Sequence, residues 1–196
     1  LIGRAHEWQQ MRKAWQATTA GMAQILLLNG EAGIGKTYLA SAFVRWTEQL
    51  GYTVASAQCY PAEGGLAYGP ILIWLRAAPL RVQWEKLGEV WLREVARLLP
   101  EAVPPNLRQP DHEPAGATWQ RTRLFDALVH AVLSQENAVL LVLDDLQWCD
   151  RETLEWLQYL LWVRPRAPLL VLATLRSGEL SADAYAATWL LELRHK

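Results

Sequence analysis

Short runs of consecutive apolar residues alternate along the chain with longer stretches in which apolar residues recur every three or four positions. The first pattern predicts strands buried on both faces, and the second predicts amphipathic helices. Strands that alternate with helices form a parallel sheet covered by helices, so the pattern predicts an α/β fold. The predicted strands are Gln24–Asn29, Tyr52–Gln58, Ala138–Leu143 and Leu169–Thr174.

Helical periodicity fills the segments between these runs. The predicted helices are Lys36–Leu50, Val82–Leu99, Trp119–Gln135 and Arg151–Val163, and a further helix-like stretch runs from Tyr185 to Arg194. Asp150 immediately precedes one of these helices, which predicts that it is the N-cap. Prolines recur between Pro100 and Gly116, so this stretch is predicted to be a long loop.

The composition indicates one globular domain over residues 1–196, with 52% hydrophobic and 20% charged residues. The 11 tryptophans favour large core packing over a binding role, with Trp46, Trp91 and Trp156 at predicted buried positions. Two cysteines provide no disulfide framework, which favours a reducing compartment, the cytoplasm. No apolar run is long enough to span a membrane.

The net charge of −1 gives no general basic field for nucleic acid. DNA contact, if the full-length protein makes it, is therefore expected through other domains. The chain begins at Leu1 without an initiator Met and stops inside a helix-like stretch, so we expect a fragment of a larger protein.

The segment from Gly30 to Thr37 matches the pattern G-x-x-x-x-G-K-[ST], between a predicted strand and a predicted helix. In that context backbone N–H groups converge on phosphate oxygens, and glycines permit their close approach. Lys36 is predicted to reach the terminal phosphates and Thr37 to ligate Mg²⁺. A tight turn without a ligand is the alternative. The predicted nucleotide contacts are Gly30, Gly33, Ile34, Gly35, Lys36, Thr37 and Tyr38.

Two acids, Asp144 and Asp145, directly follow the apolar run Leu140–Leu143. A phosphate loop needs a carboxylate at the end of a neighbouring strand to hold magnesium. We therefore expect Asp144 on the Mg²⁺ side, through water, and Asp145 to orient or activate the attacking water. An exposed turn with a helix cap is the alternative.

Four segments together carry a family resemblance: Leu1–Glu7, Leu28–Thr37, Leu141–Asp150 and Leu170–Arg176. They resemble the nucleotide-binding domain of signal-transduction ATPases with numerous domains (STAND), close to the AAA+ ATPases. More narrowly, they are similar to the AAA-type ATPase module of large bacterial LuxR-type and maltose-activator-like transcriptional regulators. The resemblance covers nearly the whole chain and implies a P-loop NTPase three-layer sandwich with a central parallel sheet.

The resemblance also implies that Ile2, Gly3 and Arg4 lie against the adenine or ribose, with an ordinary exposed turn as the alternative. It implies that Arg176 is the sensor that detects the γ-phosphate, a role that suits a bidentate cation. A structural ion pair is the alternative for Arg176. The lid or winged-helix domain of the family, and the last sheet strand, are expected beyond Lys196.

The sequence departs from the AAA+ pattern where Asp144-Asp145 replaces the usual Asp-Glu pair. The side chain of the expected base, Asp145, is therefore one methylene shorter than glutamate, and slow hydrolysis is expected. The first hypothesis is an ATP/ADP switch with Mg²⁺-dependent turnover by Lys36, Asp145 and Arg176, coupled to self-association and transcription. A nucleotide-bound interaction module without useful turnover is the second hypothesis. An AAA+ ATPase acting on DNA is the third, and the choice between ATP and GTP stays open.

Overall fold

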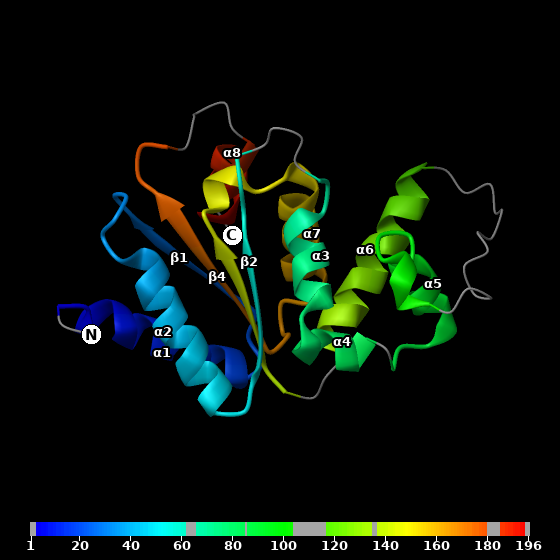
Figure 1. Ribbon diagram of the computed structural model, residues 1–196, viewed down its shortest axis with the longest axis horizontal. Helices are drawn as coiled ribbons and strands as arrows, with labels where there is room; N and C mark the ends of the chain where they lie inside the picture. The colour runs from blue at the N-terminus through cyan, green and yellow to red at the C-terminus, as the bar shows by residue number, and fades with distance from the viewer. Residues whose placement is uncertain are drawn as a thin grey trace.

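The computed structural model describes residues 3–61, 66–84, 86–103, 117–134, 137–179 and 185–194. Within them a sheet of four parallel strands has the order β1-β4-β3-β2 (Figure 1). All four predicted strands are present, and the predicted α/β fold with a central parallel sheet is confirmed. The strands are β1 (Gln24–Gly30), β2 (Thr53–Gln58), β3 (Val139–Asp144) and β4 (Leu169–Arg176).

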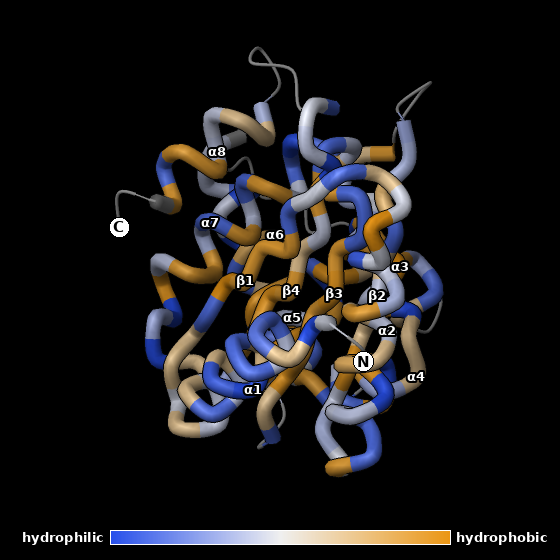
Figure 2. The backbone as a smooth tube through the Cα atoms, turned by 90° about the vertical axis from the view of Figure 1, so that its left-hand side faces the viewer, coloured by the Kyte–Doolittle hydropathy of each residue, from blue (hydrophilic) through white to orange (hydrophobic). Residues whose placement is uncertain are grey.

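Helices cover both faces of this sheet, because successive side chains of a strand point to opposite sides. Leu140 and Val142 of β3 pack in a cluster with α1 (Ala5–Thr19) and α2 (Lys36–Gln49). The intervening residues of β3 join a larger cluster on the other face, so the sheet forms the apolar middle layer (Figure 2). The helices of the larger cluster include α3 (Gly69–Arg76), α4 (Ala78–Trp84), α6 (Ala117–Leu133), α7 (Arg151–Val163) and α8 (Tyr185–Arg194).

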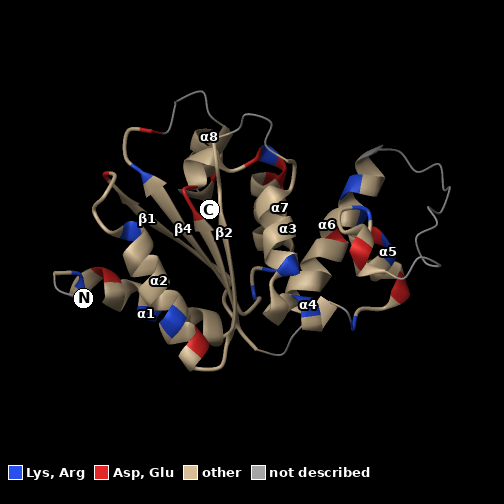
Figure 3. Ribbon diagram, viewed as in Figure 1, with Lys and Arg blue, Asp and Glu red and all other residues tan. Residues whose placement is uncertain are grey.

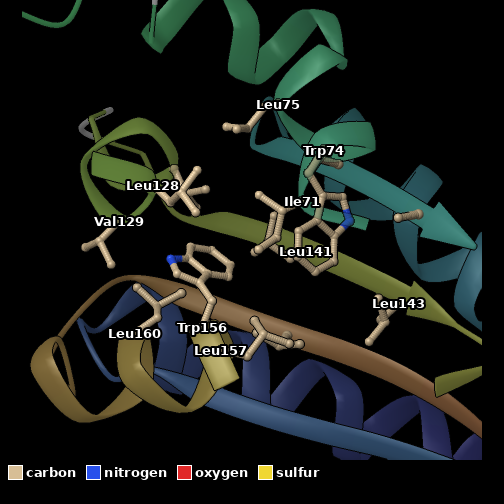
Figure 4. Close-up of a cluster of buried hydrophobic side chains, with 14 of the residues drawn as sticks. Ile71, Trp74, Leu75, Leu128, Val129, Leu141, Leu143, Trp156, Leu157 and Leu160 are labelled. Carbon is tan, nitrogen blue, oxygen red and sulfur yellow. The ribbon is translucent and has the colours of Figure 1, made fainter. Parts of the chain in front are cut away.

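Tryptophan rings fill the larger cluster. Trp74 of α3 and Trp156 of α7 are fully buried, with ring centroids 6.4 Å apart (Figure 4). Their indole N–H groups donate to the carbonyls of Val142, at 3.0 Å, and Phe125, at 3.3 Å. An unpaired buried donor costs about 1–3 kcal/mol, so these bonds remove the penalty of burying the indoles. Core packing is confirmed for Trp156, whereas Trp46 and Trp91 are only partly buried.

The predicted single helix Val82–Leu99 is wrong. The structure instead has α4, which ends at Trp84, and α5 (Glu89–Val95). Gly88 precedes α5 in an extended conformation, with φ −61° and ψ 151°. Glycine is unfavourable inside a helix, and the break at Gly88 lets α4 contact β2 while α5 packs on α6.

Two helices were not predicted. α1 is mainly polar, and its buried residues, Met11, Trp15 and Thr18, form only a sparse stripe. α3 has the opposite composition, because most of its residues are apolar and leave no helical period. The helix-like stretch from Tyr185 to Arg194 is confirmed as α8.

The proline-rich segment is described only at its start, where Pro100–Ala102 forms a short 3-10 helix. Positions 104–116 of the predicted loop lie outside the described residues. Among the helices of the described ranges, none is long and apolar enough to cross a bilayer.

Asp150 links α7 to the start of α3. Its Oδ1 accepts the N–H groups of Thr153 and Tyr68, each at 2.9 Å, and its Oδ2 accepts the Thr153 hydroxyl at 2.8 Å. The predicted N-cap is therefore confirmed, and the same carboxylate also ties down the turn before α3.

We predict that Asp150→Ala lowers the free energy of unfolding by about 2 kcal/mol, because it removes the cap of α7 and leaves the Tyr68 N–H without its acceptor. Urea unfolding followed by circular dichroism measures the change. Glu152→Ala is the matched control, since Glu152 lies in the same first turn and makes no cap bond. Equal losses in the two variants would contradict the prediction.

Candidate functional site

The candidate site lies at the carboxyl ends of the strands, where parallel α/β sheets form their binding crevices. The loop Gly30–Thr37 follows β1, Asp144 ends β3, and Arg176 ends β4. The register of the sheet sets Gly30 opposite Arg176. Figure 3 shows charged residues at the ends of β3 and β4, beyond strands without charge.

Glycines shape the loop. Gly33 and Gly35 have φ of 77° and 89°, in the left-handed region that other residues rarely adopt. A side chain at Gly30 would bring its Cβ within 3.2 Å of the Ile34 side chain. Gly35 is the N-cap of α2 and supplies no capping side chain, so the first N–H groups of α2 point into the loop without a side-chain acceptor. This arrangement suits an anion.

Lys36 is a buried cation, with 8% of the residue exposed. Its Nζ donates to the carbonyls of Gly30 and Glu31, each at 2.8 Å. The described residues give this ammonium no carboxylate partner. A buried charge is costly unless it is paired, so the environment of Lys36 fits a bound phosphate.

Thr37 and Asp144 face each other across the site. The Thr37 hydroxyl lies 3.2 Å from both carboxylate oxygens of Asp144. The Thr174 hydroxyl also donates to Asp144 Oδ1. Mg²⁺ binds through one or two protein oxygens together with phosphates and water, so this pair fits the predicted Mg²⁺ side of a nucleotide.

Asp145 points to a different partner. Its carboxylate accepts Arg176 Nε at 2.9 Å and Nη2 at 3.0 Å, a bidentate pair. Hydrogen bonding to Asp145 raises the pKa of Arg176 above its ordinary value. The ion pair that was the alternative for Arg176 thus exists, its partner is the residue expected to activate water, and the sensor role of Arg176 stays a prediction.

The N-terminal segment reaches the phosphate loop. Arg4 Nη2 donates to the Ile34 carbonyl, and Arg4 Nη1 donates to Glu7 at 2.9 Å. Arg4 and Lys36 line the same small pocket of about 130 Å³ between α1 and β1. Gly3 precedes Arg4 with φ 77°, and Ile2 lies outside the described residues.

Two predicted loop contacts lie on the outer side. Ile34 is 51% exposed and Tyr38 is 66% exposed. The structure describes no hydrogen bond or ion pair of the Tyr38 side chain, and the predicted nucleotide contact of Ile34 and of Tyr38 stays a prediction.

Sequence reasoning missed two buried polar residues of the site. Thr174 is 1% exposed and Gln147 is 7% exposed. Thr174 is a polar residue inside an apolar strand, and buried polar groups need hydrogen-bond partners. The sequence could therefore have indicated that Thr174 contacts other polar groups of the site. Gln147 carried no such signal, because it lies outside the apolar strand run and its bond to the Arg176 N–H depends on β4.

The two cysteines lie beside the acids. The Cys59 N–H donates to the Asp144 carbonyl at 2.9 Å. A hydrogen bond with the Cys59 thiol, and then burial, raise the pKa of Cys149 well above its ordinary value. The Cys149 thiol is therefore neutral near pH 7, which disfavours it as a nucleophile.

Several solved structures are similar to the chain at low identity. Drosophila ORC bound to DNA has a TM-score of 0.47 at 15% identity, over 94% of this chain and 84% of that chain. AMPPCP-bound DnaA from Aquifex aeolicus has a TM-score of 0.43 at 15% identity, over 97% and 45%. TM-scores below 0.5 decide nothing about the ligands or partners of this chain.

Sequence comparison identifies the family. An uncharacterized protein of Rhizobium meliloti (strain 1021) is 25% identical over 205 residues, which cover 97% of this chain and 19% of that protein. The chain thus spans about a fifth of this relative's length. The AAA ATPase domain model matches residues 1–172. The glycine-rich loop, the buried lysine and the strand-end acids also lie together at one edge of the sheet. The chain belongs to the AAA ATPase domain family.

Proposed function

We propose that the chain is the ATP-binding, slowly hydrolysing switch domain of a multidomain, signal-transducing transcriptional regulator in the cytoplasm. The observation that carries the proposal is the convergence of Lys36, the Thr37–Asp144 pair and the Asp145–Arg176 pair at one edge of the sheet. Self-association, and DNA contact through other domains, belong to the same proposal for the full-length protein.

Each group has a role in this proposal. The loop N–H groups and Lys36 hold the phosphates, and Thr37 with Asp144 holds Mg²⁺, which would neutralise phosphate charge when bound. Asp145 orients or activates water, and Arg176 contacts the terminal phosphate. Arg4, through its bond to the loop carbonyl of Ile34, positions the N-terminal segment over the nucleotide.

The Asp145–Arg176 pair supports slow turnover and a switch. While Arg176 holds both carboxylate oxygens, Asp145 is not free to accept a proton from water. A terminal phosphate competes with Asp145 for Arg176, and ADP lacks that phosphate. ATP and ADP thereby favour different states, and a ligand shifts a conformational equilibrium only by such a difference.

The same pair also favours the second hypothesis, a nucleotide-bound interaction module without useful turnover. If Arg176 does not leave Asp145 when ATP binds, the acid stays blocked. Nucleotide would then be a structural ligand, and ATP and ADP would bind with the same affinity. Measured affinities and turnover therefore separate the two hypotheses.

We predict that Lys36→Ala weakens ATP and ADP binding roughly tenfold to a hundredfold, since a hydrogen bond to a charged group contributes about 1.5–3 kcal/mol. Isothermal titration with ATP, ADP and GTP, with and without Mg²⁺, measures binding, and phosphate release measures turnover. Lys13→Ala, at an exposed position of α1, is the control. A folded protein that binds none of these nucleotides would contradict the proposal.

We predict that Asp145→Asn raises the affinity for ATP relative to ADP, by roughly fivefold to a hundredfold, and lowers phosphate release by about 10²- to 10⁴-fold. Removing the carboxylate charge frees Arg176 and relieves repulsion of the terminal phosphate, and coupling energies usually fall in this range. Titration of both nucleotides measures the ratio, with Asp126→Asn on α6 as the control. A ratio equal to that of the wild type would favour the interaction module.

A further inference from the structure

The buried side-chain amide of Gln147 hydrogen-bonds to both residues of the Asp145–Arg176 pair. It contacts the carboxylate of Asp145 and the main chain of Arg176. It lies on η3 (Leu146–Trp148), the short 3-10 helix that follows the acids. Its Nε2 donates to Asp145 Oδ1 at 3.0 Å and to Glu179 Oε2 at 3.4 Å, and its Oε1 accepts the main-chain N–H of Arg176 at 3.3 Å. One side chain thus joins the acid to the end of the strand that carries the arginine.

Asp145 is held by more than its ion pair. Its backbone is in the left-handed region, with φ 59°, and its N–H donates to the Thr174 hydroxyl at 2.9 Å. Its Oδ1 receives both Arg176 Nε and Gln147 Nε2, whereas Oδ2 receives Arg176 Nη2. Without Arg176, the Gln147 amide is therefore the remaining donor to this carboxylate among the described residues.

The two donors differ in how readily they can leave. The Arg176 side chain is 38% exposed and sits opposite Gly30, the first residue of the phosphate loop. Gln147 is only 7% exposed and is anchored to the main chain of β4. The exposed Arg176 side chain, which also contacts Glu179 through Nη1 at 3.4 Å, can exchange partners more readily than the enclosed Gln147.

We propose that Gln147 is a positioning residue, which keeps Asp145 in place when Arg176 exchanges its bond to Asp145 for one to the terminal phosphate. The inference rests on the proposed function and deepens it by separating the two tasks. Arg176 reports the phosphate, and Gln147 preserves the geometry of the acid. The Gln147 amide is neutral and holds the Asp145 carboxylate without neutralising its negative charge. The Arg176 guanidinium, in contrast, neutralises that charge.

Two substitutions separate the bonds of Gln147. Gln147→Glu retains an acceptor for the Arg176 N–H but loses the donor to Asp145 and Glu179, whereas Gln147→Leu loses all three bonds. If the bond to Asp145 matters, both variants lower kcat about tenfold to a hundredfold, because a displaced catalytic group costs this much. In Gln147→Leu, which adds no charge beside Asp145, the KM for ATP and the Kd of a nonhydrolysable ATP analogue stay unchanged.

The matched control is Gln158→Leu, which removes a glutamine on α7 whose amide donates to Glu192 at 2.8 Å. It is expected to leave kcat and nucleotide binding unchanged. Thermal unfolding of all variants reports on folding. In a double-mutant cycle, Gln147→Leu adds no further loss of kcat to Asp145→Asn, since Gln147 acts through that acid. Additive losses, or a raised KM in Gln147→Leu, would overturn the inference.

A second readout does not depend on turnover. In ¹⁵N-labelled protein, the Arg176 Nε–H and Gln147 side-chain amide signals are identified by their loss in Arg176→Lys and Gln147→Glu. On adding Mg²⁺ and the nonhydrolysable analogue, but not ADP, we expect the Arg176 signal to move while the Gln147 amide stays protected from exchange. Loss of protection at Gln147, or an unmoved Arg176 signal, would overturn the inference.

These outcomes are distinct from failure of the proposed function. If the wild type binds neither the analogue nor ADP, the proposed function fails, and the inference fails with it. If the wild type binds both and the Gln147 signal loses its protection with the analogue, the inference alone fails.

Discussion

The insertion of β4 between β1 and β3 is the constraint on which the candidate site depends. Its register with β1 sets Arg176 opposite Gly30, and on its other side Ala173 lies opposite Leu143, directly before the two acids. The N–H of Ser177 then donates to the Gly30 carbonyl at 3.0 Å and continues this pairing beyond the strand. Because parallel strands end at one edge, backbone hydrogen bonds along β4 fix how far the loop, the acids and the arginine lie from one another.

The hydroxyl of Thr174 contacts both adjacent acids, Asp144 and Asp145, but bonds to a different group of each. Thr174 donates to the carboxylate of Asp144 and accepts the N–H of Asp145. The left-handed backbone of Asp145 turns its side chain away from Thr37 and toward Arg176. Such a backbone costs of order 1–3 kcal/mol and persists where surrounding bonds determine it, as the bidentate pair and the Thr174 bond do here.

The apolar core supports this edge from both faces. Val142, near the end of β3, buries its side chain against the α1–α2 side, while its carbonyl accepts the indole N–H of Trp74 of α3. Asp150 ties the starts of α3 and α7 together a few residues past the acids. The strand that presents Asp144 is thus fixed by packing and by hydrogen bonds.

The sequence by itself determined the features that depend on neighbouring residues: the four strands, the phosphate loop and the N-cap at Asp150. Continuous apolar runs, fixed glycine spacing and helix-start chemistry are local, so they can be recognised without a fold. Only the tertiary structure decided the strand order, the pairing of Asp145 with Arg176 and the place of Gln147, because these join residues about 30 positions apart through β4. The break at Gly88 has a local cause, since glycine is unfavourable inside a helix, and a tertiary one. Apolar periodicity continues across it, and the competing contacts of α4 with β2 and of α5 with α6 separate the two helices.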